Sequence, residues 1–141
     1  MALVDDHLLR DLLADALSAH LVRILHDHEP ATTNMYLYRL CKSVASARGG
    51  TLTGSWPLEQ RQELGRRLVT IPETIKIVPV RLLAYRMAEI AHGHRVSTLG
   101  AEAVAAAEHL LAPLYVWEGD DGPGIRSAVE AQGGQYHTVV R

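Results

Sequence analysis

Short apolar runs of strand character alternate along this chain with longer segments of helical periodicity. The five strand-like runs are Ala2–Val4, Ala31–Asn34, Ile75–Val80, Leu114–Trp117 and Tyr136–Val140. Because neighbouring parallel strands need a long crossover between them, most often a helix, this alternation predicts a mostly parallel sheet. Helices that follow each strand would cover both faces of that sheet. The predicted fold class is therefore α/β, a three-layer α/β/α sandwich with a mostly parallel central sheet.

The helical segments follow from apolar spacing and local stop signals. Leu8 to Leu25 is predicted as one long helix or as two short ones broken near Ser18. The other predicted helices are Met35–Ala47, Pro57–Val69 with Ser55 as its cap, Leu82–Ala91, Leu99–Leu111 capped by Ser97 or Thr98, and Ile125–Ala131. Residues 51–56, 92–94 and 118–124 are predicted as loops or breaks.

Length and composition limit the class of protein. A chain of 141 residues with 48% apolar and 21% charged residues fits one globular domain, residues 1–141, rather than a disordered chain. A net charge of −2 argues against nucleic-acid binding that depends mainly on the overall charge of the protein, although a local basic face is compatible with it. The basic residues of the middle helices (Lys42, Arg48, Arg61, Arg66 and Arg67) are either such an RNA-contacting face or a solvated one.

Cys41 is the only cysteine, so the chain cannot form an internal disulfide. This favours a reducing compartment, and we expect a cytoplasmic protein. No segment approaches the roughly 20 apolar residues needed to cross a bilayer, and no secretory leader is recognisable, so no membrane association is expected.

Acidic and polar residues follow several of the predicted strands. They are Asp5 and Asp6 after the first strand, Thr32, Thr33 and Asn34 after the second, and Glu118, Asp120 and Asp121 after the fourth. Glu102, near the start of the alanine-rich helix, adds another carboxylate. Ligands of open parallel sheets bind at the carboxyl ends of the strands. Carboxylates that converge there suit Mg²⁺ or Mn²⁺, which can activate water and stabilise charge on a phosphodiester.

This arrangement resembles the PIN domain family, the metal-dependent ribonuclease fold used by VapC-like toxins of toxin–antitoxin pairs. The run Leu3–Asp5 followed by Leu8 and Leu9 is similar to the opening of that family. Residues 31–40 resemble its second strand and helix, residues 96–107 the helix with its third acid, and residues 112–118 the strand that ends on its fourth acid. The resemblance implies a PIN-like fold, an Mg²⁺- or Mn²⁺-dependent endoribonuclease acting on RNA, an antitoxin partner and a homodimer.

Position by position, the resemblance implies three catalytic carboxylates: Asp5, Glu102 and Glu118. Asp5 matches the first acid, and Glu102 substitutes for a third acid that aligns with Gly100. Glu118 matches the fourth, with Asp120 as a near alternative. The implied metal ligands are therefore Asp5, Glu102, Glu118 and Asp120.

Two positions depart from the family pattern. Residues 35–47 contain no Asp or Glu, and Arg39 lies at or next to the position of the second acid. His7 replaces the polar residue two positions after the first acid. Arg39 is expected to compete with a metal for Asp5 and Glu118 through carboxylate pairing.

The sequence thus leaves three hypotheses: an endoribonuclease, a degenerate PIN-like binding or regulatory module without nuclease activity, and a small-molecule binder that shares only the topology. Arg39 discriminates between the first two. An Arg39 that points into the acidic cluster takes the place of the metal and removes the nuclease function, whereas one that points to solvent leaves three acids for an ion.

Each candidate also has an ordinary structural interpretation. Asp5 and Asp6 can simply cap a helix, as can Glu102, and residues 118–122 can form a solvated turn. The sequence favours Asp5 as the ligand and Asp6 as the cap. Trp117, next to the predicted site, is either an edge residue of the core or a platform for an unpaired base.

Overall fold

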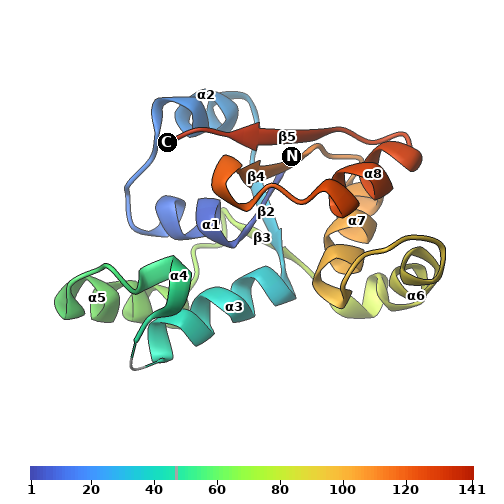
Figure 1. The fold of residues 1–141 in the computed structure, drawn as a ribbon. Helices are drawn as coiled ribbons and strands as arrows, with labels where there is room; N and C mark the ends of the chain where they lie inside the picture. Colours follow the sequence, from blue (N-terminus) through green and yellow to red (C-terminus); the bar gives the residue numbers. More distant parts are fainter. Residues whose placement is uncertain (47) are drawn as a thin grey trace.

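A five-stranded parallel sheet lies at the centre of the computed structural model, which describes residues 1–46 and 48–141 (Figure 1). The strands are β1 Ala2–Val4, β2 Pro30–Thr33, β3 Lys76–Val78, β4 Leu114–Trp117 and β5 Tyr136–Val139. Their order is β3-β2-β1-β4-β5, and every neighbouring pair is parallel. The predicted fold class is confirmed.

Helices connect the strands and form the outer layers. They are α1 Asp6–Leu13, α2 Ala19–Asp27, α3 Asn34–Ala45, α4 Gly50–Thr53, α5 Leu58–Val69, α6 Ala84–Gly93, α7 Thr98–Leu110 and α8 Pro123–Ala131, with 3-10 turns η1 Val80–Leu82 and η2 Glu118–Asp120. The alternative of two short helices is the correct one, because Ser18 caps α2 by accepting a hydrogen bond from the Leu21 amide at 3.1 Å. The predicted end of the third helix, Ala47, lies outside the described residues.

Several local predictions were wrong: residues 118–124 contain η2 and the start of α8 rather than only a loop, and α6 begins at Ala84 rather than Leu82. Residues 51–56 contain the short helix α4, whose Leu52 and Thr53 are buried, rather than a surface loop. Ser55 does not cap α5, because Pro57 occupies that position without a side-chain hydrogen bond. The helix α6 continues through residues 92 and 93, where a break was expected.

The two faces of the sheet carry separate apolar clusters, as the alternation along β1 requires. Leu3 packs with residues of α6, α7 and α8 on one face. Ala2 and Val4 pack with α1, α2, α3, α4 and α5 on the other. Figure 1 shows the sheet between these two groups of helices, which is the three-layer arrangement.

The strand order places the ends of β1 and β4 side by side. Leu3 pairs with Leu114 and Val4 with Tyr115, and the Asp5 amide donates to the Tyr115 carbonyl at 3.1 Å. The residues that follow these two strands therefore meet at one edge of the sheet. Across the described parts of the chain, no helix is long and apolar enough to span a membrane.

Candidate functional site

Asp5 joins the ends of β1 and β4. One carboxylate oxygen accepts the Leu8 amide at 2.9 Å, which caps α1, and the other accepts the Trp117 amide at 3.0 Å. The residue is almost fully buried, and this burial, with the nearby Asp6, raises the pKa of Asp5 to about 8. The sequence correctly placed Asp5 at the end of the first strand, but the helix cap is Asp5 and not Asp6.

Asp6 is also fully buried and is only partly satisfied. Its Oδ1 accepts the His7 amide at 2.9 Å, whereas Oδ2 has no hydrogen-bond partner among the described residues. Burial raises the pKa of Asp6, and the positive charge of Arg39 opposes that increase without cancelling it. A buried carboxylate oxygen without a hydrogen bond is costly, which makes it a candidate for binding a cation.

Asp6, His7 and Asp120 converge at this edge. One ligand atom from each lies within 4.8 Å of the other two. Burial, together with the charges of Arg10 and Arg39, lowers the pKa of His7 to about 4, so its imidazole is neutral at pH 7. A neutral imidazole and two carboxylates form a donor set that fits a divalent metal ion.

The other predicted carboxylates lie in different surroundings. Glu102 is buried in α7, where Oε1 accepts the Met35 amide at 2.9 Å and Oε2 has no hydrogen-bond partner among the described residues. Glu118 is exposed in η2. Asp120 lies two residues further along η2, and its negative charge contributes to the raised pKa values of both Asp5 and Asp6. The structure therefore brings Asp5 and Asp120 together with Asp6.

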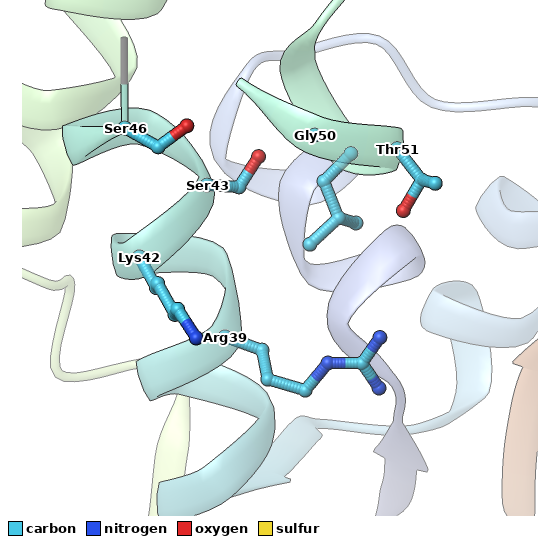
Figure 2. A pocket seen from close by; sticks show the side chains of 7 residues that line it. Arg39, Lys42, Ser43, Ser46, Gly50 and Thr51 are labelled. Atoms are coloured by element: carbon cyan, nitrogen blue, oxygen red, sulfur yellow. The ribbon is translucent and has the colours of Figure 1, made fainter. Parts of the chain in front are cut away.

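Arg39 falls between the two cases that the sequence distinguished. It extends from α3 (Figure 2), and its Nε lies 3.4 Å from Asp6 Oδ2 rather than beside Asp5 or Glu118. Its side chain is 43% exposed, however, and its contact with Asp6 is an ion pair that does not provide Oδ2 with a hydrogen bond. The guanidinium is thus a nearby counter-charge that leaves the Asp6 oxygen unsatisfied.

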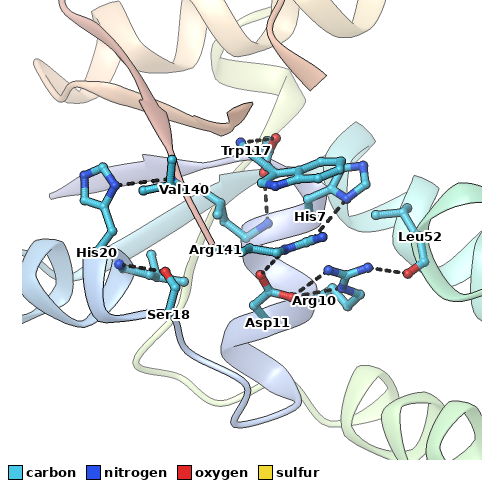
Figure 3. Close-up of polar contacts among 12 residues, drawn as sticks. His7, Arg10, Asp11, Ser18, His20, Leu52, Trp117, Val140 and Arg141 are labelled. Atoms are coloured by element: carbon cyan, nitrogen blue, oxygen red, sulfur yellow. Dashed lines mark hydrogen bonds and ion pairs between the residues drawn. The ribbon is translucent and has the colours of Figure 1, made fainter. Parts of the chain in front are cut away.

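A second layer of side chains holds His7 in place (Figure 3). The His7 ring centroid lies 4.6 Å from that of Trp117, and the Arg141 guanidinium stacks over the Trp117 ring at 4.2 Å. Arg141 also pairs with the buried Asp11 at 3.1 Å. Part of the Trp117 surface that base stacking would use is therefore already in contact with the chain itself.

Sequence reasoning missed Asp6 and His7. The predicted helix began at Leu8, whereas α1 begins at Asp6, so the capping position moves to Asp5. A cap precedes the first helical residue, and its side chain accepts the amide two or three residues later. Because Asp5 with Leu8 and Asp6 with Leu9 have the same spacing, the sequence held no signal that separated the two, and the observed start of α1 decides for Asp5.

No family model and no curated protein sequence matches this chain. Among solved structures, the chain is similar to FitAcB from Neisseria gonorrhoeae, with a TM-score of 0.60 and 15% sequence identity. The match covers 98% of this chain and 97% of the other. A likeness at this identity concerns the fold, and it agrees with the PIN-like architecture that the sequence resemblance implied.

Proposed function

We propose that this chain is a PIN-like protein of the toxin–antitoxin type that cuts RNA with the help of one divalent cation, Mg²⁺ or Mn²⁺. The observation that carries the proposal is the convergence of Asp6, His7 and Asp120 at the carboxyl edge of the sheet, within 4.8 Å of one another. The fold match over nearly the whole of both chains supports the PIN-like part of the proposal.

The chemistry of the site favours a cation. Two buried carboxyl groups, Asp5 and Asp6, have raised pKa values, and the exposed Asp120 adds negative charge beside both. Buried negative charge of this kind is relieved by protonation or by a positive ion. Asp6 Oδ2 lacks a hydrogen bond, so it offers a ligand position once the Arg39 guanidinium, 3.4 Å away, moves aside.

Each residue has a distinct proposed part. Asp6 and Asp120 bind the ion, and His7 supplies a neutral nitrogen that Trp117 and Arg141 hold in place. Asp5 positions η2 by accepting the Trp117 amide, and it is itself available as a ligand after losing its proton. Glu102 and Glu118 keep the role that the resemblance implies for them, as further metal-binding carboxylates at this edge of the sheet. The bound ion would supply an activated water and charge stabilisation at the phosphodiester.

A second candidate function is favoured by the Arg39–Asp6 pair. A positive side chain beside the best-placed carboxylate can replace a metal permanently. The protein would then be a degenerate PIN-like binding or regulatory module. An antitoxin partner, a homodimer and a cytoplasmic location are compatible with both candidates and are part of the proposal.

RNA cleavage distinguishes the two candidates. A pool of short single-stranded RNAs of random sequence is incubated with the protein in Mn²⁺, in Mg²⁺ and in EDTA, and new RNA ends are sequenced. We expect cleavage that requires the metal and that falls at least tenfold in Asp6→Asn and Asp120→Asn, a loss typical of a missing catalytic group. Asp27→Asn, an exposed aspartate at the end of α2, is the matched control. No cleavage in any condition, together with no Mn²⁺ binding, would establish the module instead.

A further inference from the structure

A cavity of about 370 Å³ opens between α3 and α4, next to the acidic edge. Its lining includes Arg39, Lys42, Ser46, Gly50, Thr51 and Leu52. Figure 2 shows Arg39 and Lys42 extending from α3, with the serine and threonine hydroxyl groups nearby. None of the described residues that line this cavity is a carboxylate, although Arg39 in its wall reaches Asp6.

We propose that this cavity binds a phosphate group of the RNA backbone through Arg39 and Lys42. The inference rests on the proposed function and names the part of the chain that holds the substrate. Lys42 follows Arg39 by three positions on α3, so the two side chains lie on the same face of the helix. Two adjacent positive charges and hydroxyl donors form the environment that a phosphate requires.

The positive charge of the cavity is only partly neutralised by the protein, through the ion pair of Arg39 with Asp6. Among the described residues, no carboxylate forms an ion pair with the exposed Lys42. Arg39 faces Asp6 through Nε, which leaves its two terminal nitrogens available to an anion. The Ser46 hydroxyl accepts the Gly49 amide at 2.9 Å, so its own proton is free to be donated.

The position of the cavity favours RNA over an acidic peptide. Arg39 contacts both the cavity and Asp6, so a phosphate bound there would lie beside the carboxylates proposed to hold the metal. This position beside the proposed metal site is what favours a phosphate of the RNA substrate over a carboxylate of a peptide.

Arg39 also couples the two sites. A phosphate in the cavity attracts the guanidinium that otherwise faces Asp6, and this leaves Asp6 more available to a cation. By linkage, metal binding at Asp6 must then strengthen phosphate binding by the same factor. The same side chain thus favours metal binding when RNA is present.

The test measures RNA binding without metal. The anisotropy of a fluorescein-labelled single-stranded RNA of eight nucleotides is followed in EDTA at several salt concentrations. We expect Lys42→Gln to weaken binding about fivefold and to reduce the slope of log affinity against log salt by about 0.7, the value for one lost phosphate contact on a single strand. Lys76→Gln, the same charge change at the exposed start of β3, should bind as the unmodified protein does.

Three results would overturn the proposal of a phosphate site, and a fourth measurement separates it from the proposed nuclease activity. Equal affinities for the unmodified protein and Lys42→Gln, or an equal loss in Lys76→Gln, would overturn the proposal. So would displacement of the RNA by hexaglutamate as efficiently as by an unlabelled RNA, because the cavity would then recognise carboxylates. Asp6→Asn should retain RNA binding in EDTA while losing cleavage, so failure of the proposed nuclease activity and failure of the phosphate site are distinguishable.

Discussion

The Nε of Arg39 lies 3.4 Å from Oδ2 of Asp6, so the carboxylate best placed to hold a cation already has a positive side chain beside it. Because Asp6 is buried and Arg39 is 43% exposed, the pair joins a fixed anion to a side chain that can move into solvent. This geometry makes the guanidinium a competitor of the metal.

Removing that competitor should strengthen metal binding. We expect Arg39→Gln to bind Mn²⁺ about three- to tenfold more tightly, since an ion pair with one exposed partner contributes on the order of 1 kcal/mol. Free Mn²⁺ is measured by electron paramagnetic resonance during a titration. Arg23→Gln, at an exposed position of α2, is the control. Weaker Mn²⁺ binding in Arg39→Gln would show that Arg39 supports the metal site instead.

Glu102 separates a structural role from a site role. Glu102→Ala should destabilise the fold by about 2–4 kcal/mol, because the Met35 amide loses its acceptor and a cavity forms in a buried position. Glu102→Gln keeps an oxygen for that amide and should cost much less. Urea denaturation measures both. If Glu102→Gln retains the fold but loses Mn²⁺-dependent cleavage, Glu102 belongs to the site; full activity would restrict it to packing α7 against α3.

Asp5 should make the stability of the metal-free protein depend on pH. Burial raises its pKa from 3.8 to about 8, so the folded state favours the protonated form. That contribution is complete below pH 4 and is lost as the pH rises through about 8. The free energy of unfolding of the unmodified protein, minus that of Asp5→Asn, should therefore fall between pH 4 and pH 8 in EDTA. Parallel pH profiles for the two proteins would contradict this.

Gly119 is needed where η2 passes close to Trp117. A Cβ at this position would overlap the indole ring of Trp117, which no side chain can accommodate without movement. We expect Gly119→Ala to displace either Trp117 or the turn that carries Asp120, and so to change the tryptophan fluorescence and weaken Mn²⁺ binding together. Gly133 also lies in a turn and has a positive φ, but a Cβ added there would meet no atom within 4 Å. Gly133→Ala is therefore the control for backbone strain without a clash. An unchanged spectrum in Gly119→Ala would be incompatible with this packing.

The sequence predicted the fold because strand and helix periodicities are properties of short segments. The five strand-like runs, the break near Ser18 and the cap at Ser97 depend on neighbours only a few residues away. The helix α4 was missed because two glycines were interpreted as a simple stop. Gly49 and Gly50 both have positive φ and turn the chain so that Leu52 becomes buried.

The site was harder to predict, because it depends on contacts between distant segments. The acid that accepts the Met35 amide is Glu102, 67 positions away in the chain, and the Trp117 amide bonds Asp5 across 112 positions. The roles of Asp5 and Asp6 were interchanged because they depend on the first residue of α1. Arg39 was correctly identified as the residue beside the acids, although its partner is Asp6.

The position of a bound metal tests the central claim most directly. Crystals soaked at saturating Mn²⁺ and measured near the manganese absorption edge should show an anomalous peak beside the carboxylates of Asp6 and Asp120, with Arg39 displaced from Asp6. A map without a peak at this edge, in which Arg39 still faces Asp6, would contradict the metal-dependent function and leave the non-catalytic module.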